Sequence, residues 1–277
     1  MKKRLSSIRH VALDMDGTIY RGNTLFETTG PFLALLRELG LGYTFLTNNP
    51  SKSVTDYLEH LREIGVPATE DQLYTSTQAT SEHLQEAYPK IKKLFVLGTP
   101  SMCEQFAEAG FELMPDNVQA EPEAVVVGFD STLTYPRLCR AAWWITQGKP
   151  YFATNPDRVC PTDQPTVLVD CGSICAALET ATHIAPTAVL GKPDPAMIRG
   201  ILHRHSLQPA NLAMVGDRLY TDIAMARRAG ALGVLVLTGE TSAAQAAKHS
   251  PPPDIVVASL AEFGAQLREA KRDTIPA

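Results

Sequence analysis

Residues 10–18 read His10-Val-Ala-Leu-Asp14-Met-Asp16-Gly-Thr18. The apolar run that ends on Asp14 is short and compact, as is typical of a buried strand. Asp14 and Asp16 are two residues apart, so their side chains point the same way in an extended chain. Two close carboxylates repel each other unless a cation lies between them. This stretch therefore predicts a strand that ends at a cation site.

The residues of this motif also indicate which cation and which kind of anion it can bind. A hard cation such as Mg²⁺ takes oxygen ligands of the kind that Asp14 and Asp16 provide. Gly17 allows a sharp turn that presents backbone N–H groups to an anion. An ordinary Asp-x-Asp-Gly surface turn has the same residues, so the motif alone leaves both interpretations open.

Outward from this motif, apolar runs and helical stretches alternate along the chain. The predicted strands are 10–14, 43–47, 93–97, 124–128, 151–154, 166–170, 188–190, 212–216, 233–237 and 255–258. The predicted helices include 31–39, 51–64, 136–146 and 221–228. Continuous apolar strands separated by helices indicate an α/β protein whose parallel sheet is covered on both faces.

Length and composition exclude several other classes. The 277 residues suggest about two domains, and 44% hydrophobic with 20% charged residues excludes a wholly disordered chain or a coiled coil. The net charge of −5 gives no basic stripe for nucleic acid. No apolar run approaches the ~20 residues of a membrane span, and no secretory signal is expected. Five cysteines, an odd number, favour reduced thiols and a cytoplasmic location.

Three further predicted strands end in polar residues: Thr47 with Asn48, Lys192, and Asp217 with Asp222. Each has a plainer explanation as a helix cap or a solvated loop residue. Taken together they are more informative, because the carboxyl ends of parallel strands meet at one edge of a sheet. A hydroxyl at a helix N-terminus and a lysine both suit phosphate. We therefore expect all four strand ends to converge on one rim of one sheet.

In these motifs the chain resembles the haloacid dehalogenase (HAD) superfamily of phosphatases. The residues that carry the resemblance are Asp14-x-Asp16-Gly-Thr18, Thr47, Lys192 and Gly216-Asp217-x₄-Asp222. Leu46-Thr-Asn-Asn49, Ala153-Thr-Asn-Pro-Asp157 and Gly191-Lys-Pro-Asp194 make it similar to the NagD-like, 4-nitrophenylphosphatase branch. The resemblance implies a Rossmann-like, doubly wound parallel-sheet core formed by residues 1–80 and 184–277, with an inserted αβ (type II) cap domain at 81–183.

The resemblance also implies a role for each matching residue. Asp14 would be the nucleophile that forms an aspartyl-phosphate, and Asp16 would protonate the leaving group and then activate water. The residues expected to bind phosphate are Gly17, Thr47, Asn48 and Lys192. The residues expected to hold Mg²⁺ are Asp14, Asp16 through its backbone carbonyl, Asp217 and Asp222.

These roles predict a Mg²⁺-dependent phosphatase of small phosphate monoesters, such as nucleoside monophosphates or sugar phosphates. The alternatives are a phospho-acceptor signalling module, which would be shorter and lack an acid at Asp16, and a dehalogenase of the same superfamily. A dinucleotide-dependent dehydrogenase would need Gly-x-Gly-x-x-Gly after the first strand. The expected partner is a small phosphorylated metabolite, with a homodimer or higher homo-oligomer formed through the cap; the sequence does not name the substrate.

Overall fold

The structure is a computed structural model that describes residues 1–160 and 164–272. The chain divides into two compact units. The first comprises 1–46, 58–74 and the described part of 198–277, and the second comprises 47–57 and the described part of 75–197. Each unit has its own principal sheet.

The first unit is built on a six-stranded sheet with strand order β15-β14-β13-β1-β4-β5. The strands are β1 (His10–Asp14), β4 (Gly42–Thr47), β5 (Leu73–Thr75), β13 (Leu212–Gly216), β14 (Leu232–Val236) and β15 (Ile255–Val257). Neighbouring strands from β15 to β4 run parallel. Every residue of β1 is buried, as its continuous apolar pattern predicts for a strand covered on both faces.

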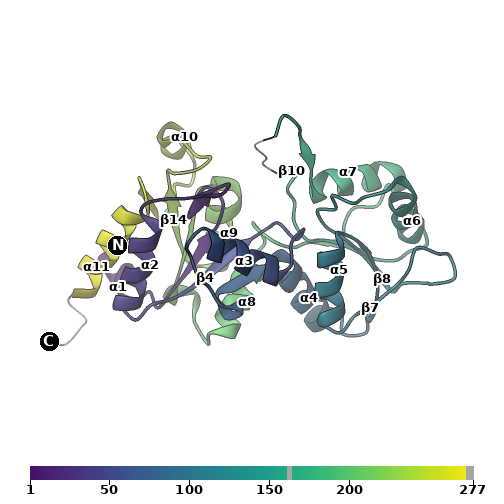
Figure 1. The fold of residues 1–277 in the computed structure, drawn as a ribbon, viewed down its shortest axis with the longest axis horizontal. Helices are drawn as coiled ribbons and strands as arrows, with labels where there is room; N and C mark the ends of the chain where they lie inside the picture. Colours follow the sequence, from purple (N-terminus) through teal and green to yellow (C-terminus); the bar gives the residue numbers. More distant parts are fainter. Residues whose placement is uncertain (161–163, 273–277) are drawn as a thin grey trace. The chain divides into compact units, whose positions relative to one another are not determined.

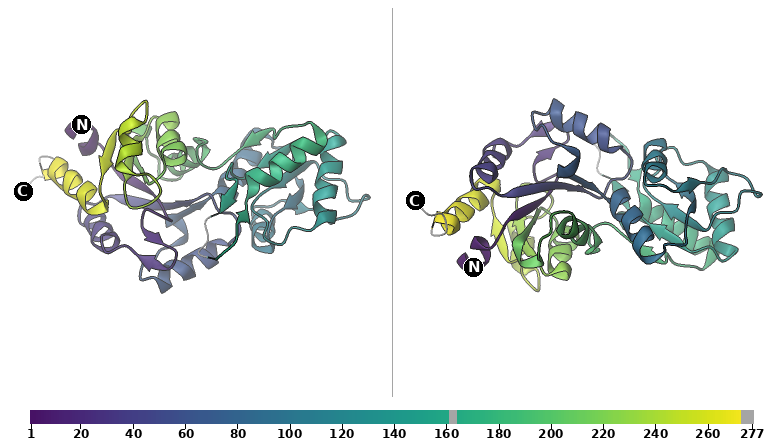
Figure 2. Two further views of the ribbon diagram at one scale, coloured as in Figure 1. Left: turned by 90° about the horizontal axis from the view of Figure 1, so that it is seen from above. Right: turned by 90° about the horizontal axis from the view of Figure 1, so that it is seen from below.

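Helices cover this sheet, and three of them, α1 (Lys2–Ser6), α2 (Thr29–Glu38) and α11 (Leu260–Arg272), pack together (Figure 1 and Figure 2). The helices wholly or partly in this unit are α1 (Lys2–Ser6), α2 (Thr29–Glu38), α3 (Val54–Glu63), α8 (Ala196–Arg204), α9 (Ala224–Ala229), α10 (Ala243–Lys248) and α11 (Leu260–Arg272). The rings of Phe32 in α2 and Phe263 in α11 are 5.8 Å apart. Short elements complete the unit: β2 (Tyr20–Arg21), β3 (Thr24–Leu25), η1 (Glu70–Gln72) and η2 (Pro209–Asn211).

The second unit holds a five-stranded parallel sheet with strand order β12-β9-β8-β6-β7. The strands are β6 (Lys93–Leu97), β7 (Glu112–Leu113), β8 (Ala124–Val127), β9 (Tyr151–Ala153) and β12 (Ala188–Val189). The helices are α4 (Ser76–Ala87), α5 (Pro100–Glu108), α6 (Tyr135–Thr146) and α7 (Cys171–Thr182). No helix in the described residues of either unit is long and apolar enough to cross a bilayer.

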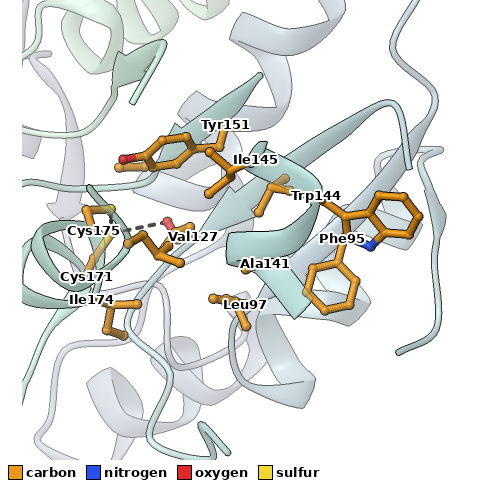
Figure 3. Close-up of a cluster of buried hydrophobic side chains, with 13 residues drawn as sticks. Phe95, Leu97, Val127, Ala141, Trp144, Ile145, Tyr151, Cys171, Ile174 and Cys175 are labelled. Atoms are coloured by element: carbon orange, nitrogen blue, oxygen red, sulfur yellow. Dashed lines mark hydrogen bonds between the residues drawn. The ribbon is translucent and has the colours of Figure 1, made fainter. Parts of the chain in front are cut away.

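Alternate residues of these strands fill two cores. Phe95, Val127 and their same-face neighbours pack against α6 and α7, where Trp144 and Ile174 close the cluster (Figure 3). The opposite set, which includes Val126, packs against α4 and α5. Because successive strand residues point to opposite faces, a sheet with helices on both faces needs apolar residues at every position. The predicted α/β class is confirmed for both units.

Three predicted elements differ from the structure. The expected strand 166–170 is only β11 (Leu168–Val169), which pairs antiparallel with β10 (Val159–Cys160) outside both main sheets. The apolar residues of this segment predicted a buried strand, but Val167 and Val169 are exposed. The expected helix 221–228 begins as a π-helical turn, η3 (Leu219–Ile223), before α9. The expected strand 188–190 is present as β12. It belongs to the five-stranded sheet, however, and not to the six-stranded sheet that contains β1.

A buried histidine in β1 gives the fold a pH-dependent stability. His10 Nε2 is 2.8 Å from Thr44 Oγ1, and its ring stacks on His205. Burial, and then the neighbouring His205, lower the pKa of His10 to about 3. The unfolded chain therefore binds a proton at this histidine below about pH 6.5 while the folded chain does not. Stability is lost as the pH falls from there towards 3.

We expect His10→Gln to remove this loss. Relative to the variant, the wild type should lose about 2 kcal/mol of unfolding free energy between pH 7 and pH 5, because one pKa unit corresponds to about 1.4 kcal/mol. Urea unfolding at the two pH values measures the difference. His203→Gln, at an exposed histidine of α8, is the control and should follow the wild type. Parallel behaviour of His10→Gln and the wild type would show that His10 does not cause the loss.

Candidate active site

Three aspartates gather at the carboxyl ends of neighbouring strands in the first unit. Asp14 is the last residue of β1, and Asp217 directly follows β13, which pairs with β1. Asp222 lies in the π-helical turn η3. One carboxylate oxygen from each residue lies within 4.8 Å of the others, and all three residues are buried. The wide turn of η3 thus adds a third carboxylate to the two at the strand ends.

Asp217 shows the electrostatic cost of this crowding. Burial, and then the charges of Asp14 and Asp222, raise its pKa to about 7. A hydrogen bond of 2.6 Å from the Glu240 N–H to Oδ2 opposes the rise only in part. The other oxygen, Oδ1, is buried and has no hydrogen-bond partner among residues 1–160 and 164–272. Such an oxygen in an all-carboxylate cluster fits a hard divalent cation such as Mg²⁺.

Glycines make room for these carboxylates. Gly17 has φ +84°, and a Cβ there would lie 2.6 Å from Asp217 Oδ2. A Cβ at Gly216 would overlap the carboxyl group of Asp222. The Gly17 N–H donates to the carbonyl of Tyr20 at 2.8 Å. The structure therefore gives Gly17 a steric role in the turn, whereas the sequence predicted that Gly17 binds phosphate.

Asp16 differs from the clustered aspartates because it is exposed. Its pKa is nevertheless raised, first by partial burial and then by the charge of Asp14, with Arg218 the largest opposing charge. A raised pKa favours the protonated carboxyl, so this environment suits a group that delivers a proton. Asp14 accepts a hydrogen bond of 3.2 Å from Thr18 Oγ1, which orients its carboxylate. The two acids of the motif therefore have distinct surroundings.

In the second unit, Asn48 directly follows Thr47 in the chain, and its side chain forms hydrogen bonds to the backbone of Lys192. Asn48 Oδ1 accepts the Lys192 N–H at 2.7 Å, and Asn48 Nδ2 donates to the Lys192 carbonyl at 3.0 Å. Thr47 Oγ1 accepts the Asn49 N–H at 3.1 Å. Thr47, Asn48 and Lys192 are each more than nine-tenths buried. The structure thus brings these three residues together, and it uses the side chain of Asn48 to hold Lys192.

The strand that leads to Lys192 belongs to a different sheet from the strand that carries Asp14. β12 pairs with β9 in the five-stranded sheet, so the prediction that all four strand ends share one sheet is wrong for this strand. Thr47, in contrast, is the last residue of β4, which pairs with β1. Gly191, at φ +76°, lets the turn after β12 pass close to the carbonyl of Thr154.

The segment that follows β14 also supports the site, although no residue of it was predicted to do so. Thr238 Oγ1 donates to the Gly17 carbonyl at 2.7 Å, and the Glu240 N–H bonds to Asp217. A Cβ at Gly239 would overlap the Asp217 carboxyl group. The sequence does contain a pattern that could have indicated this segment. Residues 238–240 follow an apolar strand, as the other polar motifs of the site do.

Two family models match parts of this chain. A model described as haloacid dehalogenase-like hydrolase matches residues 11–112, and one described as HAD-hydrolase-like matches residues 189–263. The ribonucleotide monophosphatase NagD of Escherichia coli is 30% identical over 93% of this chain and 98% of its own length. The chain belongs to the haloacid dehalogenase-like hydrolase family. Its predicted resemblance to the NagD-like branch is confirmed.

Solved structures of the family agree with this assignment. The 4-nitrophenylphosphatase of Thermotoga maritima has a TM-score of 0.89 and 37% identity, covering 95% of this chain and 98% of its own. A glycerol phosphate phosphatase of Mycobacterium tuberculosis in complex with magnesium has a TM-score of 0.85 and 31% identity, covering 95% of this chain and 77% of its own. Both are phosphatases of the same fold.

These findings confirm the predicted class of enzyme. The chain is a HAD-type phosphatase, a phosphoric monoester hydrolase with Mg²⁺ as its cofactor. The phosphatase prediction is supported over the signalling module and the dehalogenase.

Proposed function

We propose that the chain hydrolyses small phosphate monoesters with Asp14 as the nucleophile. The observation that carries this proposal is the cluster of Asp14, Asp217 and Asp222 at the end of β1, with a buried Asp217 oxygen that suits a cation ligand. Asp14, the backbone carbonyl of Asp16, Asp217 and Asp222 would hold Mg²⁺. The bound ion would neutralise charge on the carboxylates and the phosphate, which phosphoryl transfer requires.

The two acids of the first motif would divide the reaction into two steps. A carboxylate oxygen of Asp14 attacks phosphorus, and the ester oxygen leaves with the proton of Asp16. Asp16 then takes a proton from water, whose oxygen attacks phosphorus, releases phosphate and restores Asp14. The raised pKa of Asp16 supports its assignment as the acid of the first step. Each step is easier than direct hydrolysis of the ester.

Thr47, Asn48 and Lys192 would bind the phosphoryl group. The hydroxyl of Thr47 and the ammonium of Lys192 are donors of the type that stabilises phosphate oxygens. Asn48 would contribute its backbone N–H, because its side-chain amide already bonds to the Lys192 backbone. Gly17 supports the site by admitting the carboxyl group of Asp217.

The substrate is a nucleoside monophosphate, a sugar phosphate or a short phosphorylated acid in this proposal. The relatives named above act on a ribonucleotide, glycerol phosphate and 4-nitrophenyl phosphate, and all of these are small monoesters. Residues 81–183 would form a cap that excludes water and selects the organic part, between core segments 1–80 and 184–277, with β12 of the second segment completing the sheet of the cap. The ratio kcat/KM over a panel of such esters ranks the candidates.

We also propose a cytoplasmic location and a homo-oligomer formed through the cap. The location rests on the odd number of cysteines in the sequence. The proposal of an assembly is based on α6, where the aromatic side chains of Tyr135 and Trp143 are 80% and 48% exposed. Light scattering of the purified protein tests the assembly, and a monomer at micromolar concentration would contradict it.

The direct test of the function is release of phosphate from 4-nitrophenyl phosphate by the purified chain. Activity should require Mg²⁺ and should be abolished by a chelator and restored by added Mg²⁺. Equal release by the wild type in the presence and absence of the metal would contradict the proposal.

We expect Asp16→Ala to reduce kcat by about 10²–10⁴-fold, the contribution usual for a general acid–base group. The Asp217 cluster and Lys192 are unchanged in this variant, so the affinity for inorganic phosphate and for Mg²⁺ should stay within about threefold of the wild type. Steady-state kinetics and competition by inorganic phosphate measure both quantities. A fully active variant would remove Asp16 from the acid–base role.

A further inference from the structure

The side chain of Asn48 makes three hydrogen bonds to groups distant in sequence. Two of them clasp the backbone N–H and carbonyl of Lys192. The third runs from Asn48 Nδ2 to Oδ2 of Asp157 at 2.9 Å. Asp157 follows β9, so one carboxylate connects the loop after this strand with the residue that holds Lys192. The family assignment and the proposed roles leave Asp157 without a function.

Asp157 reinforces the orientation of the Asn48 amide that the Lys192 backbone also favours. A flipped amide would direct Nδ2 at the Lys192 N–H, a second donor, and would direct Oδ1 at the Asp157 carboxylate, a second acceptor. The observed orientation satisfies all three contacts, and the one to Asp157 is a charge-assisted hydrogen bond. Without the carboxylate, the two Lys192 backbone groups alone hold this orientation, and the amide loses its charge-assisted bond to the loop after β9.

The backbones on both sides of this contact are fixed. Asn155 Nδ2 and Ser76 Oγ both donate to the Asn48 carbonyl, at 2.9 and 2.8 Å. The Gly172 N–H, in the first turn of α7, donates to the Asp157 carbonyl at 2.7 Å. A Cβ at Gly172 would overlap the carbonyl of Pro156, so the loop lies directly on the start of α7. Asp157 therefore reaches Asn48 from an anchored loop.

We propose that Asp157 is a positioning residue that holds the Asn48 amide in the orientation which clasps the Lys192 backbone, and so fixes Lys192 for the phosphoryl group. This inference rests on the proposed function, in which Lys192 binds phosphate. Asp157 itself touches neither the phosphate nor the metal in this scheme. Its effect on catalysis passes through Lys192, and that dependence can be measured.

Asp157→Ala should raise the inhibition constant of inorganic phosphate and lower kcat/KM for 4-nitrophenyl phosphate by about tenfold, since small displacements of a binding group reduce rates by one or two powers of ten. Asp157→Asn should stay within about threefold of the wild type, because its side-chain oxygen can still accept from Asn48. Asp116→Ala removes an aspartate paired with Arg140 in the same unit and is the control, expected to be fully active.

A double-mutant cycle separates positioning from general support of the fold. In a Lys192→Ala background, Asp157→Ala should change kcat/KM by less than about twofold, because the group that it positions is gone. A full tenfold loss in that background, or wild-type kinetics of Asp157→Ala itself, would overturn the inference. A wild type without Mg²⁺-dependent activity would instead overturn the proposed function, so the two failures are distinguishable.

Discussion

Asp14→Asn is expected to lower the release of phosphate from 4-nitrophenyl phosphate by at least about 10⁴-fold, the size of effect seen when a covalent nucleophile is removed. The amide cannot attack phosphorus, and it also removes one charge from the oxygen cluster around Asp217. The substitution preserves shape at a buried position, so the variant should fold. Steady-state kinetics at saturating Mg²⁺ measure the loss, and near-ultraviolet circular dichroism verifies the fold.

The matched control is Asp130→Asn. Asp130 is also a buried aspartate shortly after a strand, but it pairs with Arg137 at 2.9 Å in the other unit. This control can lower the melting temperature, since it weakens a buried ion pair, but it should keep the wild-type kcat. If Asp14→Asn lost no more activity than Asp130→Asn, Asp14 would not be the nucleophile.

Asp217→Asn should have two opposite effects. In the absence of metal, the variant should be more stable than the wild type by about 2 kcal/mol, because a buried charge is removed from beside Asp14 and Asp222. In the kinetic assay, half-maximal activation should need at least about 100-fold more Mg²⁺, because one ligand loses its charge. Thermal unfolding and Mg²⁺ titration of activity measure the two effects on the same preparation.

Asp254→Asn is the control for Asp217→Asn. Asp254 is partly exposed and pairs with Arg4, so its removal should leave the Mg²⁺ requirement unchanged and should not raise the melting temperature. An Asp217→Asn variant with the Mg²⁺ requirement of the wild type would contradict the assignment of Asp217 as a ligand.

Local patterns were sufficient for much of the fold and for half of the candidate site. β1 and β13 have the predicted bounds because each is a continuous apolar run. The sheet register brings together Asp14, which ends β1, and Asp217, which directly follows β13. Asp222 was also expected there, although the π-helical turn that buries it was not. A wider turn depends on packing against the rest of the sheet, and no residue pattern specifies it.

The remainder of the site depends on contacts between residues far apart in the sequence. The strand before Lys192 was predicted correctly as a strand but was placed in the wrong sheet, because an apolar run does not specify its neighbours. Likewise, the family resemblance implied that Asn48 binds phosphate, without indicating what its side chain contacts. Its bonds to Lys192 and Asp157 cross 144 and 109 positions of sequence, so only the folded chain shows them.

The central claim is that the Asp14 cluster and Lys192 act on one phosphoryl group. A crystal structure of the chain with Mg²⁺ and beryllium fluoride, a mimic of the aspartyl-phosphate, tests it most directly. We predict the fluoride complex on a carboxylate oxygen of Asp14, the ion between Asp14 and Asp217, and Lys192 in contact with a fluorine. A complex in which Asp14 and Lys192 share no ligand would contradict the claim.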